Sequence, residues 1–388
     1  MLNNLISIII GFLLGAFSGF VPGIHSNTIS AILMEMNLDP VSLSYIIIAG
    51  LGAHTLISFV PAIFFGVPED STYISVLPGQ KLVLEGKGLV AIKLVILSSL
   101  ISMSISLALF PVVLFLFPTV FNFISPYLIF VLILASCFMI LSEKDLKKVI
   151  FALFIFILAG ALGYLTINAP IKEPLFPIFT GLFAFSTLIA TLWSKPKIPE
   201  QIIKKIEFNF WIALLAGIFL GFMADLFPGI ATPAQLAVFA SPLLLKCPKK
   251  YLVFTSSLAV SHIIFAFASL GTIGKARVGA LSYVSQLIEP SLDNLIPLMF
   301  GFILSVCLAS VLLLLIYKKL KYLFQIDTQK LYIALLIYLT FLVFVISGPL
   351  GIATLVAGTA IGSLPLFLGV KRVHVMGVII IPSILILI

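Results

Sequence analysis

The sequence predicts an all-α polytopic membrane protein made of two inverted-topology repeats, each a re-entrant hairpin broken at Pro-Gly and followed by five transmembrane helices. Three observations lead to this fold. Of the 388 residues, 62% are apolar and only 9% are charged, which no soluble domain could keep out of aggregates. Two apolar stretches are interrupted by Pro-Gly. The basic residues gather between the apolar segments in a pattern that separates two sides of a membrane.

Membrane-length apolar segments follow one another with only short polar gaps. The longest gaps, 68–88, 194–209 and 272–294, are too short and too apolar to be soluble domains. The N-terminus has no Lys or Arg before its first apolar run, so we expect no cleaved signal peptide. The expected apolar segments are 4–21, 24–36, 43–67, 89–117, 125–141, 149–168, 175–193, 210–227, 230–245, 251–273, 295–317, 331–347, 350–370 and 375–388.

The second and ninth segments begin directly after Pro-Gly, a pair that breaks helices because proline lacks the N–H donor and glycine adds flexibility. The stretch 24–34 would form roughly 16 Å of helix, about half of a bilayer core. We therefore expect each Pro-Gly to be the tip of a re-entrant hairpin that enters and leaves on the same side.

The basic residues support this arrangement. With two hairpins, one side receives only Lys172, Lys275 and Arg277, while Lys93 lies inside a span near its cytoplasmic end, where it can snorkel. The positive-inside rule assigns the other, strongly basic side to the cytoplasm and places the N-terminus outside the cytoplasmic membrane. Trp193 and Trp211 fit an interfacial belt on the cytoplasmic face. The basic side carries Lys81, Lys87, Lys144, Lys147, Lys148, Lys195, Lys197, Lys204, Lys205, Lys246, Lys249, Lys250, Lys318, Lys319, Lys321, Lys330, Lys371 and Arg372.

Five spans are expected after each hairpin. Because five is an odd number, the second half crosses the membrane in the inverted orientation relative to the first. We divide the chain into a first repeat at 1–193, a basic cytoplasmic linker at 194–209 and a second, inverted repeat at 210–388. The residues repeat as well: Gly11, Gly15 and Pro22-Gly23 recur at an offset of 206 residues as Gly217, Gly221 and Pro228-Gly229. His54 and Gly66 recur at an offset of 208 as His262 and Gly274. Inverted repeats with interrupted helices are typical of secondary transporters.

The hairpin tips have the chemistry of anion sites. A half-helix that starts at Pro-Gly presents unpaired N–H groups and a positive dipole end inside the membrane, and an anion satisfies both. An architectural break is the alternative interpretation of the tips, and the glycines before them are expected to allow close helix packing. The predicted substrate-binding residues are Pro22, Gly23, His25, Ser26, Asn27 and Thr28 at the first tip and Pro228, Gly229, Thr232 and Gln235 at the second.

Three ionisable residues are candidates for coupling transport to H⁺ or Na⁺. Asp225 lies in an apolar segment three residues before Pro228, and an intramembrane carboxylate is costly. It carries a proton in one interpretation and caps the N–H groups of its own tip in the other. His54 and His262 are candidates because they occupy equivalent positions in the repeat. We expect no cofactor and no metal, since there is no local ligand motif such as HExxH.

Two motifs resemble a known family. "GFLLGAFSGFVPGI" and "GVPEDSTYISVLPGQKLVLEGKGLVAI" at 66–92 resemble the large membrane subunit of tripartite tricarboxylate transporters. That resemblance implies a Pro-containing loop rich in Ser and Thr, here Pro68, Ser71 and Thr72, and a Gly-Lys-Gly stretch at 86–88. The loop departs from the family at Glu69-Asp70.

The second tip, "GFMADLFPGIA" at 221–231, is also similar to the Asp-x-x-Pro-Gly motif of bacterial polyprenyl-phosphate translocases. The matching residues are Asp225, Pro228 and Gly229. This second resemblance implies a lipid phosphate as an alternative substrate for the same tips.

We therefore expect a secondary transporter that moves a small carboxylate-bearing anion by alternating access, with a polyprenyl-phosphate translocase as the alternative. An enzyme is not expected, because there is no GxSxG or HExxH and only one deep aspartate. Nucleic acid is not an expected partner, since the basic residues are spread over many loops. The expected partners are the anionic molecule or lipid phosphate and membrane lipids. Homo-oligomerisation, accessory subunits, the coupling ion and the direction of transport stay open.

Overall fold

The computed structural model describes residues 2–21, 24, 26–65, 76–194, 199–201, 208–226, 247–325 and 328–388. All regular elements within these ranges are helices, and eight helical stretches are long and apolar enough to cross a membrane. The prediction of an all-α polytopic membrane protein is therefore confirmed. The eight stretches are Asn3–Phe20, Pro40–Phe65, Gly88–Leu141, Leu146–Ile167, Leu175–Trp193, Pro248–Ile273, Leu292–Ile316 and Gln329–Leu368.

The elements before the linker begin with a long helix and a nine-residue helix, as expected for a hairpin. They are α1 (Leu2–Phe20), α2 (Ser26–Met34), α3 (Pro40–Ile57), α4 (Phe59–Phe65), α5 (Val76–Leu84), α6 (Gly88–Ile124), the 3₁₀ helix η1 (Ser125–Tyr127), α7 (Leu128–Leu141), α8 (Leu146–Ile167), α9 (Leu175–Phe179), the π-helix η2 (Thr180–Phe185) and α10 (Ser186–Ser194).

The elements after the linker follow a similar order. They are α11 (Trp211–Leu226), α13 (Pro248–Ile273), α14 (Gly279–Leu287), α15 (Leu292–Ile316), the 3₁₀ helix η3 (Lys319–Gln325), α16 (Thr328–Leu368), the 3₁₀ helix η4 (Arg372–Met376) and α17 (Gly377–Leu387).

The spans that follow the two hairpins match closely. Pro40–Phe65 and Pro248–Ile273 are both 26 residues long and both begin with proline, which is favoured at the first helical position because its missing N–H would be unpaired there anyway. Asp39 caps the first of them by accepting a hydrogen bond from the Ser42 N–H at 2.9 Å. The two starting prolines are 208 residues apart, and the internal repeat stays a prediction.

Three helices differ from the expected segments. Both α5 and α14 lie in gaps that were expected to be loops, because each is a nine-residue amphipathic helix rather than a membrane-length apolar run. The expected segment 89–117 extends to Ile124, since Pro111 and Pro118 are accommodated inside α6. The expected break between 347 and 350 is present as a kink inside α16 at Gly348, whose φ of 70° is left-handed.

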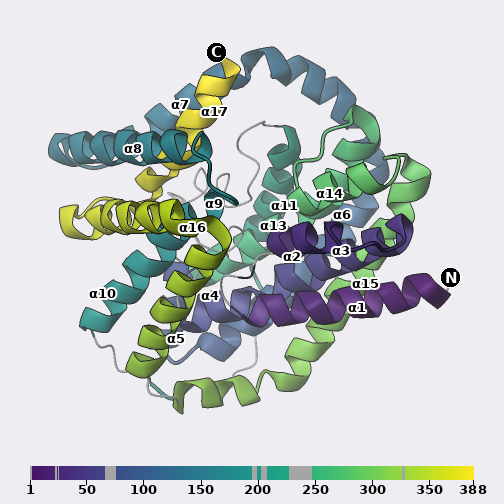
Figure 1. Cartoon of the computed structure of the whole chain (residues 1–388), viewed down its shortest axis with the longest axis horizontal. Coiled ribbons are helices and arrows are strands. Elements are labelled where there is room, and N and C mark those ends of the chain that lie inside the picture. Colours follow the sequence, from purple (N-terminus) through teal and green to yellow (C-terminus); the bar gives the residue numbers. More distant parts are fainter. Residues whose placement is uncertain are drawn as a thin grey trace.

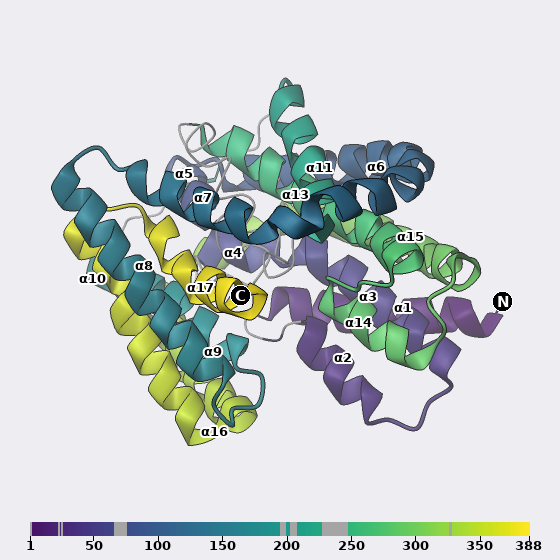
Figure 2. The ribbon, with the colours of Figure 1, turned by 90° about the horizontal axis from the view of Figure 1, so that it is seen from above.

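Helices from before and after the linker are interleaved. The helix α3 packs on α15, and α6 packs on α13; further out, α8 packs on α17 and η2 on α16. Figures 1 and 2 show α8, α10 and α16 on one side of the molecule and α1, α2, α3, α14 and α15 on the other. The division at 194–209 stays a prediction about the sequence, but in space each side contains helices of both halves.

Small polar side chains join the two halves inside the core. The hydroxyls of Ser98 and Ser256 are 2.6 Å apart between α6 and α13, and Ser305 of α15 donates to the Ala49 carbonyl of α3 at 2.5 Å. Interhelical hydrogen bonds of this kind hold helices together where no hydrophobic driving force acts between them. The linker is tied in as well, because the Gln201 side chain accepts from the Gly88 N–H at 2.8 Å and donates to the Val83 carbonyl at 3.0 Å.

Candidate functional site

Glycines bring α1 against α3 and α11 against α13. A Cβ on Gly15 would lie 2.1 Å from the Gly50 carbonyl oxygen, and one on Gly217 would lie 2.5 Å from that of Phe254. The predicted role of these glycines in close helix packing is confirmed. This close contact also places the C-terminal end of α1 beside a buried histidine of α3, and the C-terminal end of α11 beside a buried histidine of α13.

In the first pair, Ser18 of α1 meets His54 of α3. The Ser18 Oγ lies 2.8 Å from His54 Nδ1 and 3.1 Å from the Gly15 carbonyl oxygen. Both side chains are buried. When the hydroxyl donates to the carbonyl, the imidazole Nδ1–H donates to the hydroxyl, so the pair has one consistent arrangement of protons.

In the second pair, Asp225 of α11 meets His262 of α13. The carboxylate Oδ1 is 3.4 Å from His262 Nε2, and the side chains are 0% and 3% exposed. That separation is longer than an ordinary N–H···O hydrogen bond, and neither carboxylate oxygen has a hydrogen-bond partner among the described residues. The structure thus brings together two of the predicted coupling residues, and the two carboxylate oxygens and His262 Nε2 lack hydrogen-bond partners among the described residues.

A third charged group, Arg277, belongs to the same region. It interacts electrostatically with Asp225 from the loop between α13 and α14. Its Nε and Nη2 atoms are buried and have no hydrogen-bond partner within the described ranges. The sequence placed Arg277 among the external loop charges, and only the scarcity of basic residues on that side could have drawn attention to it.

The helix α2 starts beside this region with its polar tip residues. Ser26 is 5% exposed, and its Oγ is without a hydrogen-bond partner in the described part of the chain. Ser30, one turn later, donates to the Ser26 carbonyl at 2.9 Å. The amide of Asn27 packs on α14, where a Cβ on Gly279 would fall 2.6 Å from it.

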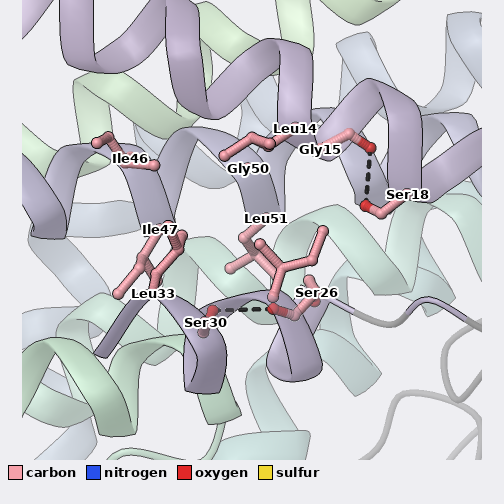
Figure 3. A pocket seen from close by; sticks show the side chains of 11 residues that line it. Leu14, Gly15, Ser18, Ser26, Ser30, Leu33, Ile46, Ile47, Gly50 and Leu51 are labelled. Carbon is pink, nitrogen blue, oxygen red and sulfur yellow. Dashed lines mark hydrogen bonds between the residues drawn. The ribbon is translucent and has the colours of Figure 1, made fainter. Parts of the chain in front are cut away.

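A small cavity separates α2 from α1 and α3. Figure 3 shows Ser18, Ser26 and Ser30 facing it among aliphatic side chains. It has room for about one water molecule. The lining is completed by Leu14, Gly15, Ile29, Leu33, Ile46, Ile47, Gly50 and Leu51.

The other predicted site residues lie outside the described residues. No group of three metal-binding side chains comes together in the part of the chain that the structure describes. The predicted site residues outside the described ranges are Pro22, Gly23, His25, the side chain of Thr28, Pro68, Ser71, Thr72, Pro228, Gly229, Thr232 and Gln235.

A second buried polar cluster joins the α7–α8 loop, η2 and η4. Arg372 of η4 donates to the carbonyls of Leu182 and Phe183 at 2.9 and 3.0 Å, to the Ser186 hydroxyl, and to Thr187 Oγ1 at 2.6 Å. A π-helix leaves carbonyls out of the ordinary i to i+4 ladder, so the guanidinium replaces the missing donors. The sequence counted Arg372 as a cytoplasmic loop charge, whereas here it fastens η4 to η2.

Glu143 anchors the same cluster from the α7–α8 loop. Its Oε1 accepts hydrogen bonds from His374 Nε2 and from the Lys371 backbone N–H, both at 2.8 Å. Burial raises the pKa of this carboxyl, but the hydrogen bonds from His374 and Lys371 and the positive charges of these two residues together lower it by more, so its pKa lies below the ordinary value of 4.5.

Replacing Glu143 with glutamine is expected to lower the melting temperature at neutral pH. A lowered folded-state pKa stabilises the fold above pH 4.5, and this contribution disappears as the pH falls below 4.5 through the folded-state value. The loss at about pH 7 should be that of a charge-assisted hydrogen bond, roughly 1.5–3 kcal/mol. Melting temperatures of the two proteins should converge only once the pH has fallen below the folded-state pKa of Glu143. Glu200→Gln, in the exposed linker, is the control; a Glu143→Gln difference that is constant with pH contradicts the assignment.

Comparison with known proteins gives two matches. The model of the tripartite tricarboxylate transporter TctA family matches residues 5–377. An uncharacterized protein from Methanocaldococcus jannaschii is 30% identical over 325 residues, which cover 80% of this chain and 79% of that protein. No solved structure matches the chain.

Proposed function

Because the chain belongs to the tripartite tricarboxylate transporter TctA family, we propose that it binds a small carboxylate-bearing anion at its hairpin tips and carries it across the cytoplasmic membrane by alternating access. Membership of the family makes the chain a tricarboxylate transporter subunit, that is, part of a secondary transporter. The tip site, the coupling ion, the cytoplasmic membrane and an external N-terminus are the parts that we propose.

The observation that carries the proposal is the unused hydroxyl of Ser26 at the start of α2. This nine-residue helix is roughly 14 Å long, too short to span a bilayer. Its first residue, Ser26, is buried and has an unused hydroxyl among the described residues. The first N–H groups of a helix have no partner within the helix and lie at its positive dipole end, so a carboxylate can accept hydrogen bonds from them.

The size of the cavity favours alternating access. Room for about one water molecule beside Ser26 cannot hold a tricarboxylate. Loading therefore requires α2 to move away from α1 and α3, whose own contact is held by backbone approach at Gly15. A hairpin that moves against a rigid helix pair is the kind of motion by which inverted-repeat transporters change access.

The buried pair of Asp225 and His262 supports coupling to protons. Both groups can take up a proton, they lie 3.4 Å apart, and the two carboxylate oxygens and His262 Nε2 have no hydrogen-bond partner in the described part of the protein. Ser18 and His54 form the corresponding pair in the other half, but without a carboxylate. We propose that the proton binds on the Asp225 side alone.

A polyprenyl phosphate is the alternative substrate. The face of α11 opposite its packing on α13 carries exposed apolar side chains: Ile212, Leu215 and Phe219 are 86%, 52% and 59% exposed. Lipid tails would cover that face in a membrane, so a lipid phosphate could approach Asp225 from the side. The same tip donors would then hold the phosphate.

Thermal stabilisation of the purified protein tests the proposal. A tricarboxylate such as citrate, at about 100 times its Kd, should raise the melting temperature by roughly 5 °C because it binds only the folded state. Ser26→Ala should reduce this shift, since it removes the unused hydroxyl. Ser30→Ala should leave it unchanged, because that hydroxyl already serves the Ser26 carbonyl. Stabilisation by a polyprenyl phosphate and not by any carboxylate would replace the leading proposal with the alternative.

A further inference from the structure

The loop between α13 and α14 turns back over the end of α13. Gly274 ends α13 with a left-handed φ of 66°, and the Ser269 hydroxyl donates to the Lys275 carbonyl at 2.9 Å. This hydrogen bond spans six residues and folds the loop back along the helix. The loop charges are thereby directed toward the protein rather than away from it.

The loop then enters α14 directly against the start of α2. Gly279 follows Arg277 by two residues, and a Cβ there would fall 2.6 Å from both amide atoms of Asn27. Asn27 is the neighbour of Ser26, whose hydroxyl is unused. Arg277, from the second half of the chain, is therefore placed close to the hairpin tip of the first half.

The two basic residues of this loop have different surroundings. The Lys275 ammonium lies over the Phe121 ring, 4.2 Å from its centroid, and the residue is exposed. Arg277 is half-buried; its buried Nε and Nη2 atoms have no hydrogen-bond partner among the described residues. Its electrostatic interaction is with Asp225. A buried guanidinium with unpaired donors is costly and is an efficient site for a carboxylate, which it can bind through two parallel N–H···O bonds.

We propose that Arg277 binds a carboxylate of the transported anion and that this anion takes the place of Asp225 as its counter-charge. This inference rests on the proposed function, which supplies the anion. The carboxylate would lie between the guanidinium and the first N–H groups of α2. The planar guanidinium would bind one carboxylate of the substrate through two parallel N–H···O bonds. A second carboxylate of the same molecule could accept from the first N–H groups of α2.

The exchange of partners has a consequence for the proton. Once Arg277 pairs with the substrate, the Asp225 carboxylate loses its cation and gains a nearby negative charge, so it takes up a proton from solution. Among the described residues, His262 of α13 lies 3.4 Å from this carboxylate, and Arg277 of the loop acts on it electrostatically. The helix α6 also packs on α11, and its one titratable residue, Lys93, lies over the Tyr317 ring.

Citrate binding to the purified full chain, measured by calorimetry, tests the role of Arg277. Arg277→Gln should weaken binding by about 10- to 100-fold, the loss of a charge-assisted pair of hydrogen bonds. Arg277→Lys should retain part of the affinity, because lysine keeps the positive charge but cannot form the two parallel hydrogen bonds of a guanidinium. Lys275→Gln, in the same loop, should change the Kd by less than about threefold.

A double variant distinguishes whether Arg277 binds the anion or only neutralises the charge of Asp225. If Arg277 only neutralises Asp225, Asp225→Asn together with Arg277→Gln will restore wild-type citrate affinity, and the inference is wrong. If Arg277 is a ligand, the double variant will bind as weakly as Arg277→Gln, while Asp225→Asn alone will bind citrate at least as tightly as the wild type. Should the wild type bind no citrate or other carboxylate, the proposed function itself fails. The same variants titrated with a polyprenyl phosphate then decide whether Arg277 binds that anion instead.

Discussion

Replacing Asp225 with asparagine is expected to remove proton-driven transport while leaving exchange of the anion intact. Asparagine resembles the protonated carboxyl in shape and charge but cannot release the proton, so the site stays loadable and net movement of protons stops. In proteoliposomes, citrate uptake driven by a pH gradient should fall by about 100-fold, a barrier increase of roughly 2.7 kcal/mol. Counterflow of labelled citrate against unlabelled citrate should persist at a similar rate.

A second aspartate serves as the matched control. Asp293 lies in the first turn of α15 and is exposed, so Asp293→Asn should retain both activities. If Asp225→Asn keeps the wild-type dependence on the pH gradient, Asp225 does not carry the proton, and capping of its own hairpin tip becomes the better interpretation. Loss of both gradient-driven uptake and counterflow would mean that the carboxylate is needed for binding, which contradicts the exchange of partners at Arg277.

Replacing Gly15 with alanine is expected to prevent stable folding. The new Cβ would lie 2.1 Å from the Gly50 carbonyl oxygen, and both partners are backbone, so neither can turn away. The helices α1 and α3 would have to separate along their whole contact. Overpacking typically costs 1–3 kcal/mol; here we expect about 3 kcal/mol or more, because no flexible side chain can absorb it. The variant should give little monodisperse protein in detergent and a strongly lowered melting temperature.

The facing glycine offers a close control. A Cβ on Gly50 would meet only the Gly11 carbonyl oxygen, at 3.4 Å, so Gly50→Ala should fold with nearly wild-type stability. Gly217→Ala, at the equivalent position of the second half, should behave like Gly15→Ala, since its Cβ would lie 2.5 Å from the Phe254 carbonyl oxygen. Equal tolerance of Gly15→Ala and Gly50→Ala would show that the approach of α1 to α3 is looser than described.

Much of the fold could be predicted because apolar length and helix breakers are local properties. The break at Gly348-Pro349 was expected at the right place, and so were the spans that start near Pro40 and Pro248. The short helices α5 and α14 were missed because nine residues with a polar face resemble a loop in composition. The interleaving of the halves follows from contacts between helices far apart in the chain, which hydropathy does not encode.

The candidate site could be predicted only in part for a similar reason. Asp225 and His262 were recognisable because an ionisable residue inside an apolar run is costly, and the structure places them 3.4 Å apart. Arg277 looked like an ordinary loop charge, since its importance comes from a loop that folds back onto α13 through Ser269. The hydrogen bonds of Arg372 could not be predicted for a similar reason, because its partners are the carbonyls of a π-helix that no sequence motif marks.

The most direct test of the central claim is a structure of the protein with citrate bound in a lipid nanodisc, in which the position of the anion is measured. We expect a citrate carboxylate at hydrogen-bond distance, about 3 Å, from Arg277 and from the first N–H groups of α2. Citrate held elsewhere, with the Arg277 Nε and Nη2 atoms and the Ser26 hydroxyl still unused, would contradict the claim that the start of α2 and this arginine bind the transported anion.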